Sequence, residues 1–95
     1  MPRPRELPAR ASLYAAHGEA IRVIRVESEM GQSQLAEAAD IDLSHLGRIE
    51  RGQANPTLRT QWRLVLGLQT SHRRVGELMD RFLAEQNPET SAGNP

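Results

Sequence analysis

The stretch QSQLAEAADIDLSHLGRIER, residues 32–51, decides the fold of this chain. Its first eight residues place apolar side chains at helical spacing, and Asp40-Ile41-Asp42 interrupts the pattern before a second apolar run reaches Arg51. Asp42 is a good N-cap for the second run, and Gly52 is a typical left-handed residue beyond a helix end. The stretch therefore predicts two short helices joined by a tight turn. Such a pair cannot bury its own apolar face, so the rest of the chain must complete the core.

The two predicted helices separate inward from outward positions. The inward residues of the pair and its turn are Leu35, Ala36, Ala39, Ile41, Leu46 and Ile49. At offsets of three, four and seven, the opposite side of the second helix carries Ser44, Gly47, Arg48 and Arg51. This outward stripe presents the hydroxyl of Ser44, a gap at Gly47 where there is no side chain, and the guanidinium groups of Arg48 and Arg51.

Three further helices are predicted around the pair, over about residues 13–29, 57–68 and 71–86. We expect the main part of the first to start near Gly18, because glycine weakens a helix. Thr57 and Ser71 are the predicted caps of the other two. The predicted inward residues are Leu13, Ala16, Ala20, Ile21, Ile24 and Ser28, then Leu58, Trp62, Val65 and Leu68, then Val75, Leu78, Met79, Phe82 and Leu83.

Length and composition indicate one small α-helical domain. The chain has 95 residues, of which 38% are hydrophobic, and one each of Trp, Tyr and Phe, so aliphatic side chains must fill the core. There is no cysteine, which excludes disulfides and cysteine-bound metal. No window approaches the roughly 20 apolar residues that cross a membrane, and nothing resembles a secretory signal. We therefore expect a cytoplasmic protein that is not associated with a membrane.

The two ends of the chain have compositions that oppose folding. Residues 1–12 contain three prolines among three arginines, which predicts a flexible basic arm. The arm is either an ordinary disordered terminus or a segment that reaches phosphates or a minor groove. Residues 87–95, NPETSAGNP, are predicted to form a disordered polar tail. The folded domain is therefore expected over residues 13–86.

The charged residues are unevenly distributed along a chain of zero net charge. Twelve arginines balance twelve acidic residues, which is not typical of a nucleic-acid-binding protein. Between residues 44 and 64, however, Glu50 alone opposes Arg48, Arg51, Arg59 and Arg63. The three histidines, His17, His45 and His72, are too scattered to suggest a metal site. We find no convergent nucleophile, base and oxyanion donors, so no catalytic residue, metal or cofactor is predicted.

Four segments, IRVIR at 21–25, LAEAADI at 35–41, LGRIERG at 46–52 and NPTL at 55–58, carry a family resemblance. Over about residues 20–78 the chain resembles the helix-turn-helix domain of the lambda-type phage repressors, the bacterial Xre group. The resemblance implies an all-α, five-helix domain whose second motif helix, residues 43–51, enters the DNA major groove. The chain departs from the family at three places: Gly31 replaces a capping Ser or Thr, Asp40 a turn Gly, and Gln69-Thr70 a Gly-Val.

The resemblance assigns DNA contacts to individual residues. Gln32 matches a phosphate-contacting glutamine, and Arg51 and the loop through Asn55 match a segment that meets the phosphate backbone. The positions that match base-facing residues are Leu43, Ser44, Gly47 and Arg48. We expect Arg48 to read a guanine through its guanidinium fork, with a phosphate contact as the alternative. Leu43 either touches a thymine methyl or packs at the helix start, and Gly47 either keeps the groove floor clear or is merely tolerated.

Glu50 is unexpected on a helix that faces DNA, because its carboxylate would repel phosphates. It follows the inward Ile49, and the family pairs this glutamate with the arginine that matches Arg25. We therefore expect a partly buried Arg25–Glu50 ion pair that braces the first helix against the third.

The predicted function is a sequence-specific regulator of transcription that binds double-stranded DNA, and specifically a repressor that occupies a promoter. A palindromic operator and a homodimer are expected, because one helix reads only a few base pairs. The predicted dimer residues are Leu66, Met79, Phe82 and Leu83. Alternatively, Phe82 and Leu83 fold back onto the first helix near Leu13 and Tyr14. Two other functions stay open: the antitoxin of a toxin–antitoxin pair, with a toxin as its partner, and a protein-interaction module that does not bind DNA.

Overall fold

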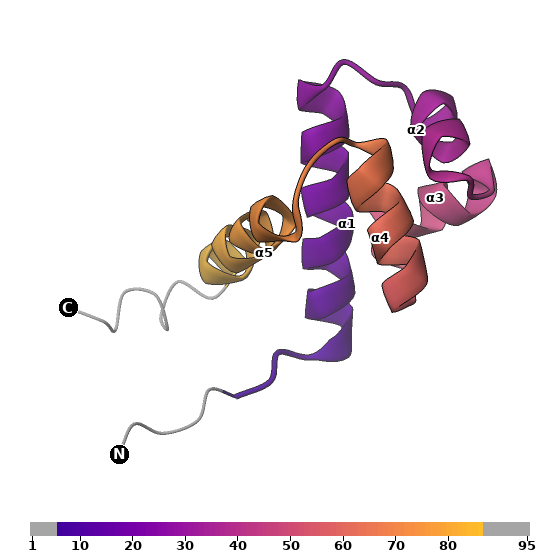
Figure 1. Cartoon of the computed structure of the whole chain (residues 1–95). Coiled ribbons are helices and arrows are strands. Elements are labelled where there is room, and N and C mark those ends of the chain that lie inside the picture. The colour runs from indigo at the N-terminus through magenta and orange to yellow at the C-terminus, as the bar shows by residue number, and fades with distance from the viewer. Residues whose placement is uncertain (1–5, 87–95) are drawn as a thin grey trace.

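Five helices pack around one apolar core in the computed structural model, which describes residues 6–86 (Figure 1). The helices are α1 (Arg10–Glu27), α2 (Gln32–Ala39), α3 (Leu43–Glu50), α4 (Leu58–Gly67) and α5 (His72–Gln86). The predicted all-α, five-helix class is confirmed. The predicted tail, residues 87–95, and the first five residues of the predicted arm lie outside the described residues.

The core is aliphatic, as the composition requires. Its largest fully buried side chains come from four helices: Ile21, Leu35, Leu46, Ile49 and Leu64. Burying each of them stabilises the fold by roughly 1.5–3 kcal/mol. Helix α1 packs against α3 and α5, and α2 packs against α3 and α4. The helix-turn-helix pair α2–α3 therefore depends on α1 and α4 for its other half of the core.

Helix α1 is continuous, and it begins three residues and ends two residues earlier than predicted. It begins at Arg10, so the predicted arm boundary at residue 12 is wrong, as is the predicted start near Gly18. Gly18 is buried inside the helix, together with His17. Ser28, predicted to face inward, is exposed at the C-cap because the helix ends at Glu27.

Gly18 lies inside α1 although glycine weakens a helix, because there is no room for a larger residue at this position. A Cβ on Gly18 would lie 2.7 Å from the carbonyl oxygen of Glu50 and even closer to that of Ile49. Gly52, with φ +73°, lies equally close to α1, since its Cβ would be 2.9 Å from the Cα of Ala15. These two glycines let the backbone of α1 cross directly over the end of α3.

Asp40 takes the place of the turn glycine between α2 and α3, and Asp42 does not cap α3 through its side chain as predicted. Asp40 adopts the left-handed conformation, with φ 54° and ψ 52°, and closes the end of α2. Asp42 occupies the N-cap position of α3, yet its side chain makes no capping hydrogen bond. At the other end of α2, Gly31 is the N-cap, and its N–H donates to Oε1 of Gln34 at 2.7 Å. Gly31 has no side-chain oxygen, so only this half of a capping box forms.

The inward face of α4 is predicted correctly at Val65 and Leu68, which are buried, but not in the first half of the helix. Leu58 and Trp62 were predicted to face inward, but they are 74% and 50% exposed, and Leu64 is fully buried instead. The last turn of α4 packs closely on α2, since a Cβ on Gly67 would lie 3.1 Å from the backbone N of Ala39. This close packing directs Leu64 inward. The predicted cap Thr57 is confirmed, since its Oγ1 accepts from the N–H of Thr60 at 3.0 Å.

The link between α4 and α5 forms without the usual glycine. Gln69 adopts φ 53°, and the N–H of Thr70 donates to the carbonyl of Val65 at 3.0 Å. Ser71 caps α5 as predicted, because its Oγ accepts from the N–H of Arg74 at 3.2 Å. The departure from the family at Gln69-Thr70 thus leaves the helix connection intact.

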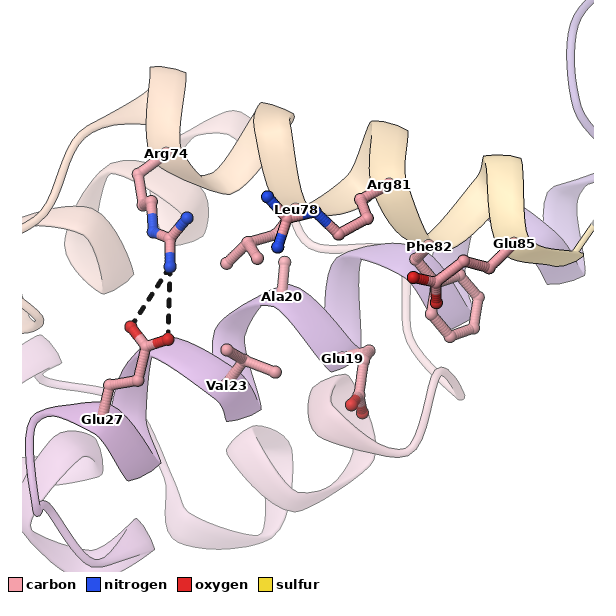
Figure 2. Close-up of a pocket in the computed structure, with 9 residues that line it drawn as sticks. All are labelled: Glu19, Ala20, Val23, Glu27, Arg74, Leu78, Arg81, Phe82 and Glu85. Atoms are coloured by element: carbon pink, nitrogen blue, oxygen red, sulfur yellow. Dashed lines mark hydrogen bonds and ion pairs between the residues drawn. The ribbon is translucent and has the colours of Figure 1, made fainter. Parts of the chain in front are cut away.

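Helix α5 lies across α1, and a shallow groove runs between them (Figure 2). Leu78 and Ala20 meet at its base, and Nη2 of Arg74 pairs with Oε1 of Glu27 at 3.2 Å at one end. Phe82 lines the other end of the groove and is half-buried. Phe82 therefore contributes to the packing of α5 on α1 within one chain.

Two glycine substitutions should have opposite effects on stability. Gly18→Ala should lower the free energy of unfolding by about 3 kcal/mol, because backbone carbonyls occupy the space for its Cβ. Gly76→Ala in α5, where a Cβ would meet no atom within 4 Å, should raise it by about 1 kcal/mol through helix propensity. Urea denaturation followed by circular dichroism measures both changes. Equal effects of the two substitutions would contradict the close crossing of α1 and α3.

Candidate nucleic-acid interface

Helix α3 exposes most of the predicted outward stripe. Ser44, Arg48 and Arg51 are exposed, and Leu43 at the start of the helix is 48% exposed. On the opposite side Leu46 and Ile49 are fully buried. The helix is therefore held by its inner face and presents a hydroxyl and two guanidinium groups outward.

Gly47 was predicted to face outward as a gap in the stripe, but it is buried. A Cβ at this position would lie 3.0 Å from Nη1 of Arg51, so the guanidinium of Arg51 covers the glycine. The stripe consequently has no empty gap in this structure. The absence of a side chain at Gly47 is what allows Arg51 to lie flat along the helix.

Arg48 and Arg51 have no acidic partner among residues 6–86. Nη2 of Arg48 lies 3.4 Å from Nδ1 of His45, and Nε of Arg51 donates to Oε1 of Gln53 at 3.3 Å. Most of the five N–H donors of each guanidinium stay available. Planar donor groups of this kind are suited to phosphate oxygens and to the O6 and N7 atoms of guanine.

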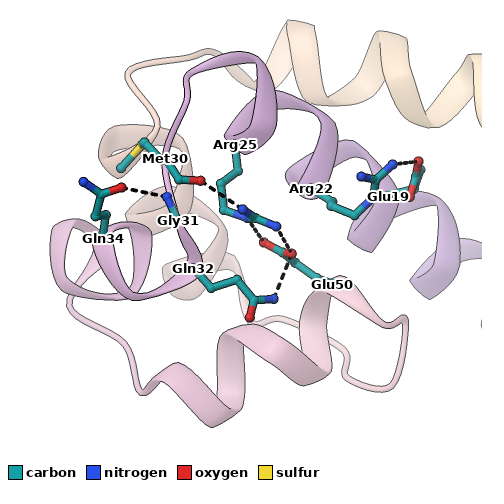
Figure 3. A network of polar contacts seen from close by, with 8 residues as sticks. All are labelled: Glu19, Arg22, Arg25, Met30, Gly31, Gln32, Gln34 and Glu50. Atoms are coloured by element: carbon teal, nitrogen blue, oxygen red, sulfur yellow. Dashed lines mark hydrogen bonds and ion pairs between the residues drawn. The ribbon is translucent and has the colours of Figure 1, made fainter.

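Glu50 is neutralised by Arg25, as predicted (Figure 3). Nε of Arg25 donates to Oε2 of Glu50 at 2.7 Å, and Nη2 donates to Oε1 at 3.0 Å, so the pair is bidentate. Only 14% of the Arg25 side chain and 4% of the Glu50 side chain are exposed. Nη1 of Arg25 also donates to the carbonyl of Met30 at 2.9 Å. One arginine thus ties α1 to α3 and to the segment that leads into α2.

Gln32, the first residue of α2, joins this network. Its Nε2 donates to Oε1 of Glu50 at 3.1 Å, which orients the side chain and leaves one amide N–H free of that bond (Figure 3). The N-cap Gly31 offers no side-chain acceptor to the first-turn N–H groups of α2. Uncapped N–H groups at a helix start attract anions. The start of α2 therefore presents a second set of hydrogen-bond donors beside α3, without a charged side chain of its own.

The loop after α3 holds the remaining predicted contact residue. Asn55 is exposed between Gly52 and the start of α4, and the exposed Arg59 follows in the first turn of α4. Arg63, which also contributes to the local arginine excess, has a structural contact: its Nη1 donates to the carbonyl of Asp40 at 3.3 Å. Sequence patterns gave no signal for this contact, because its partners lie 23 positions apart.

The described residues carry no feature of a metal site or of a membrane-spanning helix. Residues 6–86 contain no group of three or more His, Asp or Glu side chains placed to hold a metal ion. Within the same range, no helix has the length and apolar character required to span a membrane. The exposed guanidinium groups near α2 and α3 are the most distinctive chemistry of this part of the chain.

Comparison with known proteins gives the same picture. The helix-turn-helix family model matches residues 21–75, more than half of the chain. The immunity repressor protein of Bacillus phage phi105 is 43% identical over 56 residues, which are 57% of this chain and 39% of that protein. The regulator SutR of Escherichia coli is 35% identical over 48 residues, which are 50% of this chain and 27% of that protein. The chain thus matches well under half the length of either relative.

Solved structures resemble the fold over most of its length. The restriction-modification controller protein C.Esp1396I has a TM-score of 0.70 and 27% identity, over 75% of this chain and 93% of that chain. Its tetramer in complex with its natural 35-base-pair operator gives the same score and coverage. The controller protein C.AhdI of Aeromonas hydrophila has a TM-score of 0.64 and 29% identity, over 65% of this chain and 94% of that chain.

Loss of the buried ion pair should be far more costly than loss of an exposed one. Glu50→Gln should lower the free energy of unfolding by about 3 kcal/mol, because Arg25 is left buried and uncompensated. The control is Glu19→Gln, which breaks the exposed pair with Arg22 and should cost less than about 1 kcal/mol. Chemical denaturation of the two variants side by side measures the difference. Similar losses would contradict the bracing role of Glu50.

Proposed function

Because the chain belongs to the helix-turn-helix family, we propose that it is a sequence-specific, double-stranded-DNA-binding regulator of transcription. In this proposal it acts as a repressor that blocks a promoter by occupying it. The resemblance to a phage immunity repressor and to a controller protein seen on its operator supports this function. Because the matched segments cover well under half of the curated relatives, the target genes do not follow from these resemblances.

The proposal rests on one observation. Arg48 and Arg51 are exposed on α3 and its C-cap, whereas Glu50, the acidic residue of that helix, is buried against Arg25. Helix α3 contains Glu50, but Arg25 binds that carboxylate and buries it. Between Leu43 and Arg51 the outer surface therefore carries two exposed guanidinium groups and no exposed carboxylate, although the exposed Asp42 lies at the N-cap of the helix. Such a surface attracts the phosphates that bracket a DNA groove.

The proposed contacts divide between sequence reading and positioning. Arg48 donates to a guanine in the major groove, and Ser44 and Leu43 lie beside the neighbouring base edges. Gly47 was also predicted to face base edges, and it would do so only if the side chain of Arg51 moved off it. Arg51, whose guanidinium covers Gly47, is assigned to the phosphate backbone beside the same groove. The phosphate contacts are assigned to the residues around this centre: Gln32, the first-turn N–H groups of α2, and Asn55.

The protein is further proposed to bind DNA as a homodimer. Leu58, Trp62 and Leu66 follow one another at intervals of four residues along α4 and are 74%, 50% and 69% exposed. This α4 ridge is self-complementary: a two-fold axis at Trp62 would set Leu58 of one copy against Leu66 of the other. Leu66 was among the predicted dimer residues. Met79 packs against the core and Phe82 lines the α1–α5 groove, so these two, with the half-buried Leu83, are expected to add less.

Sedimentation equilibrium at micromolar concentration tests the dimer. The native protein should sediment as a dimer, and Leu66→Glu should sediment as a monomer, because charges would face one another across the axis. The thermal midpoint of Leu66→Glu at high dilution should equal that of the native chain, since Leu66 is exposed in the single copy. Leu83→Glu is the comparison variant and should weaken the dimer less. A native chain that stays monomeric on and off DNA would contradict the proposal.

Selection of binding sites from a random duplex pool tests the function and the role of Arg48 together. The native protein should enrich a palindrome, and Arg48→Ala should lose preference at one guanine and about tenfold or more in affinity. Arg73→Ala, an exposed arginine on α5, is the control and should leave the selected site unchanged. Affinity should weaken by orders of magnitude between about 50 and 200 mM salt. Failure to enrich any site would contradict DNA reading and favour a protein-interaction module.

A further inference from the structure

The first half of α4 has no buried side chain to hold it in place. None of residues 57–62 is buried, and Leu58 and Trp62 are exposed. The second half is anchored differently, since Leu64 and Val65 lie in the core. The start of α4 therefore depends on a contact other than the burial of apolar side chains.

A hydrogen bond between His17 and Gln61 provides such a contact. His17 on α1 is only 8% exposed, and its Nε2 donates to Oε1 of Gln61 in the first half of α4. The two residues lie 44 positions apart in the chain. Among residues 6–86 this is the only side-chain hydrogen bond that joins α1 to α4.

The imidazole of His17 fits its position only in the neutral form. Because Oε1 of Gln61 accepts, Nε2 carries the ring proton and Nδ1 is left with its lone pair. Nδ1 is buried and has no hydrogen-bond partner among residues 6–86. A second proton on Nδ1 would create a buried charge and a buried donor without an acceptor. Burial accordingly lowers the pKa of His17, and the hydrogen bond to Gln61 opposes this only in part.

No acidic side chain in the described part of the chain is placed to offset a positive charge on His17. The residues that line the same surface depression come from α4, α5 and the loop before α4, and among them only His72 titrates. Where α3 crosses α1 at Gly18, the carboxylate of Glu50 is already bound by Arg25. A protonated His17 ring would therefore stay uncompensated.

We propose that His17 and Gln61 form an acid-sensitive latch, in which protonation of His17 releases the first half of α4 from α1. The release disturbs the α4 ridge, because Leu58 and Trp62 belong to that half. The effect on self-association rests on the dimer proposed above, whereas the latch is a property of the single chain.

The pH range of the latch follows from the lowered pKa of His17. In the released state the ring titrates near its ordinary value of about 6.5, so that state binds more protons below this pH. The closed state is therefore fully favoured above about pH 6.5 and is weakened as the pH falls below that value.

Native-state hydrogen exchange of the full chain, followed by nuclear magnetic resonance between pH 7.5 and 5.0, tests the latch. The N–H of Gln61 donates to the carbonyl of Thr57 at 2.9 Å, and the N–H of Leu68 in the anchored half donates to that of Leu64 at 2.9 Å. The Gln61 amide should be less protected than the Leu68 amide at every pH, because it exchanges through a smaller opening. After correction for intrinsic exchange rates, its protection should fall by up to about 30-fold across this range, the ratio expected when a ring of ordinary pKa titrates only in the released state.

Two substitutions locate the proton. His17→Gln keeps a donor for Gln61 but cannot gain a charge, so the protection of the Gln61 amide should become nearly independent of pH. His72→Gln is the matched control, because His72 lines the same depression and its ring lies 4.4 Å from that of Trp62. This control should keep the native fall in protection. The measurements are repeated on Leu66→Glu, so that self-association does not contribute.

Four outcomes would overturn the latch. The first three are equal protection of the Gln61 and Leu68 amides, a fall in protection that persists in His17→Gln, and a fall that disappears in His72→Gln. The fourth needs no variant: ring signals of His17 that show half-protonation at pH 6.5 while the helices are intact. Sedimentation at pH 7.5 and 5.5 examines the ridge separately, and self-association should weaken at pH 5.5 in the native chain but not in His17→Gln. A native chain that is monomeric at both pH values would contradict the dimer, while the exchange results would still decide the latch.

Discussion

The bidentate contact between Arg25 and Glu50 is the constraint on which the proposed interface depends. A carboxylate on α3 would repel DNA if it faced outward, and it would destabilise the core if it were buried alone. Arg25 resolves both problems at once, since it neutralises Glu50 and also binds the carbonyl of Met30 before α2. Gln32 then bonds to the same carboxylate. The orientation of α3, the entry into α2 and the charge of the outer surface are thereby set by one buried polar cluster.

Close backbone crossings provide the rest of the rigidity. Gly18 and Gly52 bring α1 onto the end of α3, and Gly67 brings α4 onto the end of α2. These crossings allow a short chain to close a core from Leu, Ile, Val and Ala alone, with its single Trp left half-exposed. The inner faces of α2 and α3 are fully used for this packing. Their outer side chains are therefore free for the proposed DNA contacts, and the exposed apolar residues of α4 form the surface proposed to meet a second copy.

Sequence patterns predicted those features that depend only on residues close together in the chain. The bounds of α2, the caps Thr57 and Ser71, and the inward residues of α2 and α3 follow from spacing and capping preferences, and the structure has them. Val65 and Leu68 of α4 are buried as predicted, but the burial of Leu64 was missed. Two faces of that helix are apolar, and only contact with α2 selects Leu64 over Leu58. The burial of Gly47 under Arg51 was also missed. It depends on a side-chain conformation, which helical spacing does not specify.

The most direct test is to map the DNA-binding surface on ¹⁵N-labelled protein titrated with a short mixed-sequence duplex in low salt. The account predicts the largest chemical-shift changes at Ser44, Arg48 and Arg51 and at the first turn of α2, with the exposed side of α5 unaffected. The same experiment on Glu50→Gln, at a temperature where it stays folded, should shift those signals before any DNA is added. Changes confined to α4 and α5, with α3 unperturbed by DNA, would contradict the central claim that α3 is the reading surface.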